Sequence, residues 1–184
     1  IATGRGYHSA SVLTKAQEIE CRMINLNGAS IHDLDGSLTD SNPLVSASVR
    51  DIIEYLDQND VDYAVTTLNH YFISNFDSFV ARISKFMDTD HSEESTADDV
   101  LNDDVTNAQL VAHYGEIKAI EELNLSEEDP ALKMMVFSSN KNELDLFREQ
   151  FAAYEDLDLT SSAADNIEIT HSHAQKGLAV EAYV

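Results

Sequence analysis

Apolar residues recur along the chain at two spacings, which separate predicted helices from predicted strands. A stripe that repeats every three or four residues predicts helices at residues 7–20, 44–58, 75–87, 107–123 and 141–154. Apolar or alternating runs predict strands at residues 21–26, 61–67, 71–73, 133–138, 157–160 and 167–170. These elements lack the regular alternation of a doubly wound sheet. They predict an α+β fold, in which a mixed or antiparallel sheet carries helices on one face.

Two stretches fall outside this pattern. Residues 27–43 are mostly polar and contain the turn pair Asp35-Gly36, which predicts a hairpin-like excursion. Residues 88–104 are acidic and nearly free of large apolar side chains, which predicts a solvated loop or insertion. The first residues are typical of a strand end and the last ones of an opening helix, so we expect a segment of a longer protein.

Charge is strongly unbalanced along the chain. Its 184 residues include 34 acidic and 11 basic side chains, a net charge of −23. A surface this negative repels nucleic acid and anionic lipid, so we expect neither as a partner. A site for phosphate esters would have to concentrate its cations locally. The single cysteine, Cys21, and the absence of a signal peptide or of a ~18-residue apolar run predict a soluble cytoplasmic protein.

Residues 33–40 read Asp-Leu-Asp-Gly-Ser-Leu-Thr-Asp, the nucleophile signature of the haloacid dehalogenase superfamily. In that chemistry one aspartate attacks phosphorus while a second, two residues on, protonates the leaving group. The nucleophile follows a buried parallel strand, which requires a run of apolar residues before it. Only Ile31 is strongly apolar among residues 27–32. The same letters are typical of a plain hairpin turn, and both interpretations of Asp33 remain open on local sequence.

The order of motifs along the whole chain resembles the Cof-type, type IIB cap branch of the haloacid dehalogenase-like phosphatases. Ile1-Ala2-Thr3-Gly4-Arg5 resembles a strand ending in motif II. Asn27-Gly28-Ala29 is similar to the point where the cap begins, and Ala174-Gln175-Lys176-Gly177 to motif III. The resemblance implies a core remnant at 1–22, an α+β cap at 23–170 and a return to an incomplete Rossmann-like core at 171–184. It also implies that Asp33 and Asp35 lie in a cap turn.

By this resemblance, two residues carry the catalytic roles that the chain contains. Thr3 is the hydroxyl that binds a phosphoryl oxygen, and Lys176 is the cation that holds nucleophile and phosphate together. Gly4 lets backbone amides approach phosphate, and Arg5 either contacts phosphate or closes the turn. Asn27 and Gly28, at the cap hinge, contact substrate or simply accept unusual backbone angles.

With Asp33 and Asp35 in a cap turn, the resemblance implies that the two motifs that supply the catalytic aspartates and most magnesium ligands lie outside these 184 residues. Thr3 and Lys176 do not provide the oxygen ligands that Mg²⁺ requires. The resemblance therefore implies that Mg²⁺ is a cofactor of the intact parent protein, that this segment binds no metal tightly, and that the segment alone is inactive. The parent would hydrolyse small phosphorylated metabolites through an aspartyl-phosphate.

Two other classes of function remain. The chain is alternatively a non-catalytic acidic α+β binding module, or a phosphatase with Asp33 as the nucleophile. His171 and His173 lie two apart on a predicted strand, so they share a side and would suit a transition metal, but no third ligand is identifiable. Solvent-facing histidines explain this pair better.

Overall fold

A computed structural model describes residues 1–87, 110–111 and 113–182 of the chain. Its α-helices are α1 (Tyr7–Ala16), α2 (Ser46–Gln58), α3 (Phe76–Met87), α6 (Lys141–Phe151) and α7 (Lys176–Glu181). Its strands are β1 (Met23–Asn25), β2 (Ser30–His32), β3 (Leu38–Ser41), β4 (Asp62–Thr67), β5 (Tyr71–Ile73), β6 (Ile117–Ala119), β7 (Ala131–Phe137), β8 (Leu157–Thr160) and β9 (Asn166–His171). Two short 3₁₀ turns are η1 (Leu26–Gly28) and η2 (Ile120–Glu122).

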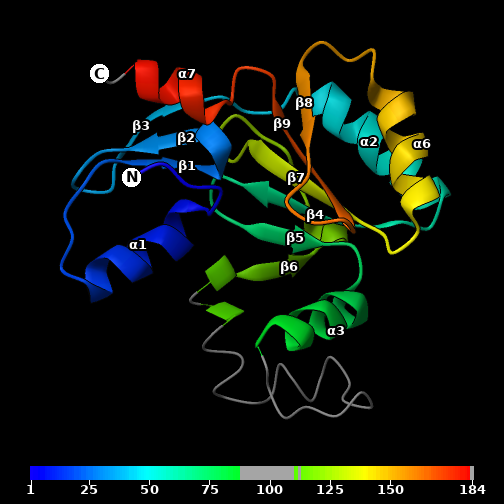
Figure 1. Cartoon of the computed structure of the whole chain (residues 1–184), viewed down its shortest axis with the longest axis horizontal. Helices are drawn as coiled ribbons and strands as arrows, with labels where there is room; N and C mark the ends of the chain where they lie inside the picture. Colours follow the sequence, from blue (N-terminus) through cyan, green and yellow to red (C-terminus); the bar gives the residue numbers. More distant parts are fainter. Residues whose placement is uncertain (88–109, 112, 183–184) are drawn as a thin grey trace.

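A six-stranded sheet forms the centre of the molecule, in the order β6-β5-β4-β7-β9-β8 (Figure 1). β5 and β6 run parallel, and the other neighbouring pairs are antiparallel. The predicted α+β fold with a mixed sheet is therefore confirmed. The strand β6 falls in residues 107–123, for which the apolar spacing predicted a helix; residues 117–119 instead extend the sheet edge beside β5.

The two faces of this sheet have different coverings. One face packs on α2 and α6 through a core that includes Ile52, Leu56, Val65, Met134 and Phe147, each at most 1% exposed. α3 packs on the other face, where Phe79, Val80 and Ile83 meet strand residues of β4 and β5. The prediction that helices lie on one face thus holds for α2 and α6 and is wrong for α3, because apolar spacing marks a buried stripe without indicating which face of a sheet it meets.

A smaller antiparallel sheet, β1-β2-β3, lies beside the first, with α1 and α7 on its two sides (Figure 1). The apolar spacing at residues 7–20 places Val12 and Leu13 on the face predicted to be buried, but in α1 they are exposed, whereas Ala10 and Thr14 are buried. Small side chains let the helix approach β1 closely. No helix in the described part of the chain is long and apolar enough to cross a bilayer.

Candidate functional site

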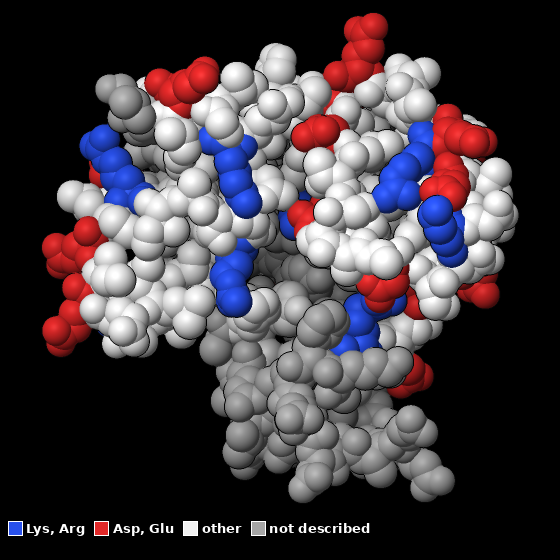
Figure 2. Space-filling view, viewed as in Figure 1, with Lys and Arg blue, Asp and Glu red and all other residues white. Residues whose placement is uncertain are grey.

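A cavity of about 810 Å³ lies between the exposed part of the six-stranded sheet and the turn that precedes α1. Strands β4, β5 and β7 and the residues around β9 form one wall, and residues 4–9 form the other. Figure 2 shows one face of the molecule, with Lys and Arg side chains around a hollow in its middle. Among the described residues the cavity wall holds three Lys or Arg side chains, three Asp or Glu side chains and four of the seven histidines. Cations are thus enriched here relative to the whole chain.

The turn of Thr3, Gly4 and Arg5 is joined to the hinge by backbone hydrogen bonds. Ala2 pairs in parallel with Ile24, and the Asn27 amide donates to the Thr3 carbonyl oxygen at 3.1 Å. The Arg5 amide donates to Thr3 Oγ1 at 3.2 Å, which leaves the hydroxyl proton of Thr3 free to be donated elsewhere. A Cβ at Gly4 would lie 3.0 Å from Asn27 Oδ1, so glycine is what permits this close approach.

The hinge itself has a left-handed backbone at three consecutive residues. The φ angles of Leu26, Asn27 and Gly28 are 48°, 62° and 109°. Asparagine and glycine accept this region, whereas leucine does so only at a conformational cost. A Cβ at Gly28 would lie 2.9 to 3.0 Å from backbone atoms of Gln175, the residue that precedes Lys176. The hinge therefore contacts both the motif II turn and the segment that leads into α7, so the structure brings these three predicted motifs together.

A buried ion pair lies on the side of this junction formed by the six-stranded sheet. Lys133 Nζ, on β7, donates to Glu168 Oε2, on β9, at 2.7 Å, and their side chains are 7% and 11% exposed. Asn27 Nδ2 donates to the same oxygen at 3.0 Å. Burial acts to raise the pKa of Glu168, but hydrogen bonds from Lys133, Ser162 and Asn27 and the lysine charge outweigh it, so the pKa is lowered. Glu168 is therefore an ionised carboxylate that ties the hinge to the sheet.

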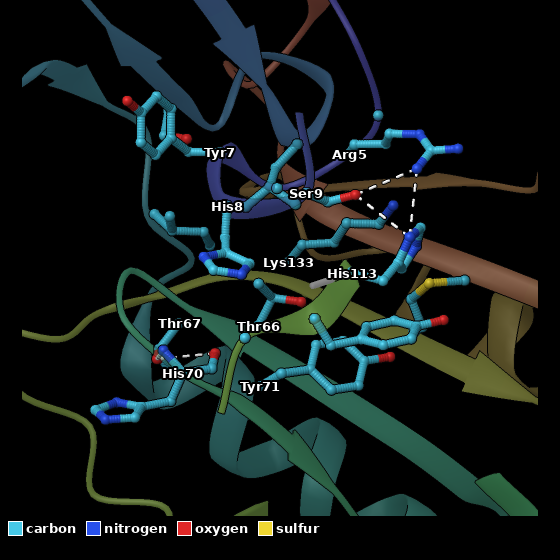
Figure 3. A pocket seen from close by; sticks show the side chains of 18 of the residues that line it. Arg5, Tyr7, His8, Ser9, Thr66, Thr67, His70, Tyr71, His113 and Lys133 are labelled. Carbon is cyan, nitrogen blue, oxygen red and sulfur yellow. Dashed lines mark hydrogen bonds between the residues drawn. The ribbon is translucent and has the colours of Figure 1, made fainter. Parts of the chain in front are cut away.

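Arg5 reaches from the turn to the opposite wall of the cavity (Figure 3). Its Nη1 donates to Ser9 Oγ at 3.2 Å and lies 3.3 Å from Nδ1 of His113. Burial, and then the charge of Arg5, lower the pKa of His113, which favours the neutral ring that accepts from Arg5. Among the described residues Arg5 contacts no carboxylate, so its charge is available to a ligand.

A second histidine lies at the rim of the cavity. His70 Nδ1 is 2.7 Å from Asp129 Oδ2, and its Nε2 is 3.8 Å from Glu116 Oε2. Burial acts to raise the pKa of Asp129, but hydrogen bonds from His70, the Asn69 amide and Thr67 outweigh it and lower the pKa. The pair fixes the loop between β4 and β5 against the start of β7.

The Asp33–Asp40 signature lies in the hairpin between antiparallel strands β2 and β3. Asp33 pairs with Arg22 at 2.9 Å, and Asp35 accepts from Ser37 Oγ at 2.6 Å. Hydrogen bonds from Arg22 and the Leu34 amide lower the pKa of Asp33, as bonds from Ser37 lower that of Asp35. Neither aspartate lines the cavity. Gly36 does, and its Cα packs against the side chain of Tyr7. A hairpin turn does not provide the parallel strand end that a nucleophile requires.

The described residues do not form a magnesium site. No group of three or more His, Cys, Asp or Glu side chains in that part of the chain is placed to hold a metal ion. The rings of His171 and His173 lie 5.1 Å apart, and the Nδ1 of His171 accepts from the backbone of His173 rather than facing a third ligand. Mg²⁺ prefers several oxygen ligands, and the turn of Thr3 and the start of α7 do not bring carboxylates together.

Sequence reasoning missed most of the charged and histidine side chains of the cavity: Lys133, Glu168, His113, His70 and Arg82. One signal was present for Lys133, because it is a single charged residue inside an otherwise apolar strand. Such a residue, on a strand buried on both faces, requires a buried partner. No comparable signal marks His113 or His70, whose partners are more than fifty residues away.

The sequence model of the haloacid dehalogenase-like hydrolases matches residues 1–184, so the chain belongs to this family. Its fold is similar to a haloacid dehalogenase-like hydrolase from B. subtilis, with a TM-score of 0.75 and 22% identity, over 99% of this chain and 64% of that one. It is also similar to such a hydrolase from Bacteroides thetaiotaomicron, with a TM-score of 0.67 and 13% identity, over 98% of this chain and 60% of that one.

A third similar structure is described as a subclass IIB sugar phosphatase of the same superfamily, with a TM-score of 0.65 and 15% identity, over 98% of this chain and 59% of that one. The chain therefore spans less than two thirds of the length of these structures. No curated protein sequence matches it. The family predicted from motif order, and its subclass IIB neighbours, are confirmed.

Proposed function

We propose that this chain is the cap and part of the core of a Mg²⁺-dependent phosphatase, which hydrolyses small phosphorylated metabolites through an aspartyl-phosphate. The observation that carries the proposal is the junction of three segments beside one cavity. The hinge at Asn27 and Gly28 contacts both the turn of Thr3 to Arg5 and the segment before Lys176. Gly4 and Arg5 of that turn line the cavity, opposite the polar face of the sheet.

Each group at this junction suits one task in phosphoryl transfer. The Thr3 hydroxyl has a proton to donate to a phosphoryl oxygen, and glycine at position 4 lets backbone amides approach the same anion. Lys176, exposed at the first position of α7, supplies a positive point charge. Arg5, with no described carboxylate partner, supplies a second positive charge. These groups bind and position an anion, and a nucleophile has to come from outside the described residues.

We further propose that the nucleophilic aspartate and the magnesium ligands belong to a longer polypeptide that contains this chain, and that the chain alone is inactive. Apolar side chains exposed on the two helices beside the smaller sheet support this: Leu13 on α1 is 51% exposed and Leu178 on α7 is 49% exposed. Contiguous exposed apolar surface is typical of a face that contacts further protein. The single cysteine supports a reducing compartment such as the cytoplasm.

A phosphate-release assay on the full-length protein, with a broad panel of phosphate esters and Mg²⁺, tests the proposal. We expect hydrolysis of at least one ester and its loss on chelation with EDTA. Lys176→Ala should lower kcat by a factor on the order of 100 to 1,000, because a preorganised charge on the phosphoryl group is lost. The control is Lys141→Ala, since Lys141 is also an exposed lysine at the first position of a helix, α6.

Two results would contradict the proposal. If the full-length protein hydrolyses no ester with Mg²⁺, the phosphatase function is wrong, and an acidic binding module becomes the better description. If Lys176→Ala and Lys141→Ala have equal activity, Lys176 is not the catalytic lysine. The shorter chain of 184 residues should release no phosphate under the same conditions.

A further inference from the structure

The cavity face of the six-stranded sheet is polar at its centre. Thr66 on β4 lies opposite Lys133 on β7 in the strand register. Glu168 on β9 lies opposite Met135, two residues along β7 from Lys133 and on the same face. The side chains of Thr66, Lys133 and Glu168 all line the cavity. A ligand in the cavity therefore meets a hydroxyl, an ammonium and a carboxylate on adjacent strands.

The charges on this side of the cavity are paired. Lys133 Nζ donates to Glu168 at 2.7 Å, and Arg82 Nη1 donates to Asp165 Oδ2 at 2.5 Å. The third acidic residue of the cavity wall, Glu116, lies 3.7 Å from Lys118 Nζ. Among the described residues each of these charges on the sheet side therefore has a partner of opposite sign. The opposite wall differs, because Arg5 contacts no described carboxylate.

Glu168 is the counter-ion of Lys133. A counter-ion stabilises an ammonium that is nearly enclosed, since the protein interior replaces water poorly as a solvent for charge. Glu168 also accepts from Asn27 at 3.0 Å, so the carboxylate is held in place from two directions. Lys133 is thus already neutralised before any ligand enters.

We propose that Lys133 and Glu168 act as a charge filter, which admits uncharged, hydroxyl-bearing leaving groups and rejects those with a second anionic group. The inference rests on the proposed phosphatase function. A second phosphate or carboxylate near Lys133 would also face Glu168, and their repulsion is weakly screened in a sheltered cavity. A ligand hydroxyl accepts from Lys133 and donates to Glu168 at the same time. The net charge of −23 adds to the rejection of a second anion.

Matched pairs of esters test the filter in the full-length protein with Mg²⁺. One pair is a hexose monophosphate and the corresponding hexose bisphosphate. The other is glycerol phosphate and phosphoglycerate: the first has a hydroxymethyl group where the second has a carboxylate. We expect kcat/KM to favour the uncharged leaving group by on the order of tenfold or more.

Glu168→Gln should lower this preference by on the order of tenfold, because the amide keeps an oxygen for Lys133 and Asn27 but leaves the lysine charge unpaired. Lys133→Gln should raise the preference, since it leaves the carboxylate unpaired. The double variant, with neither charge, should return towards the wild-type ratio. The control is Glu149→Gln, which makes the same change in net charge at an exposed residue of α6, on the other side of the sheet.

The outcomes separate the two proposals. If no ester on a broad panel is hydrolysed, the phosphatase function fails and the filter with it. If esters are hydrolysed but the wild type prefers the bisphosphate or phosphoglycerate, the filter alone is wrong. It is also wrong if folded Glu168→Gln, verified by circular dichroism, keeps the wild-type ratio, or if Glu149→Gln shifts the ratio equally. If Glu168→Gln does not fold, Lys133→Gln is the test: the filter predicts a raised preference for the uncharged leaving group, and an unchanged ratio contradicts it.

Discussion

The two faces of the six-stranded sheet share their strands but differ in chemistry. The face under α2 and α6 is apolar and closed to solvent; its residues include Tyr63, Val65, Met134, Val136, Ile167 and Ile169. The cavity face uses the positions between them: Ala64, Thr66, Lys133, Met135 and Glu168. Because strand side chains alternate, each strand provides packing on one face and recognition on the other. We expect substitutions on the first face to change stability through packing. We expect substitutions on the second face to act through charge interactions.

The largest expected effect is on the apolar face. Phe147, on α6, is 1% exposed and contacts the rings of Tyr55 and Phe151. Phe147→Ala should lower the free energy of unfolding by about 4 kcal/mol, because it removes buried area and leaves a cavity. Leu146→Ala, at the preceding residue, which is 49% exposed, should change the free energy of unfolding by less than about 1 kcal/mol. Chemical denaturation measures both, and equal losses would contradict the assignment of this face as the core.

The next effect belongs to the ion pair on the cavity face. Lys133→Met leaves the Glu168 carboxylate nearly buried without its counter-ion, so the free energy of unfolding should fall by about 3 kcal/mol. The double variant Lys133→Met with Glu168→Leu should lie within about 1 kcal/mol of wild type, since apolar residues replace a buried pair without large loss. Urea denaturation of wild type, the single variant and the double variant tests this. If the two side chains contributed only by packing, the double variant would lose more free energy of unfolding than the single variant.

The smallest effect is a pH dependence that only the cavity face should show. The pKa of Glu168 is lowered in the folded state, so its stabilising contribution is complete above the ordinary glutamate pKa and is lost as the pH falls through the lowered value. Wild type should exceed Glu168→Gln in free energy of unfolding by about 2 kcal/mol at neutral pH. The difference should shrink below about pH 4. The corresponding difference for Phe147→Ala should stay constant with pH, and a parallel decline would show that the pH effect is not local.

Most of the fold could be predicted from apolar spacing. The predicted helix at 75–87 corresponds to α3, and the predicted strand at 71–73 to β5. The helix at 44–58 and the strand at 61–67 correspond to α2 and β4 with small shifts at their ends. The predicted acidic loop at residues 88–104 lies outside the part of the chain that the structure describes.

The errors have a common cause. Val12 and Leu13 form an apolar stripe on α1, yet this stripe faces outwards and small residues pack inwards. Residues 117–119 fit a helical stripe but pair with β5 in parallel. In both cases the apolar spacing is present in the sequence, but contacts with the neighbouring element determine which residues are buried and which element forms. Tertiary contacts override a short local preference because they bury more surface.

The sequence by itself determined the family and the approximate positions of most helices and strands, while the motif roles of Thr3 and Lys176 stay predictions. Those features depend on residue type and on spacing along the chain. Only the tertiary structure decided that Asn27 contacts both the motif II turn and Glu168, that Lys133 is neutralised across two strands, and that Arg5 meets His113. Such pairs are distant in sequence, and charge interactions depend on distance and burial, which a single sequence does not contain.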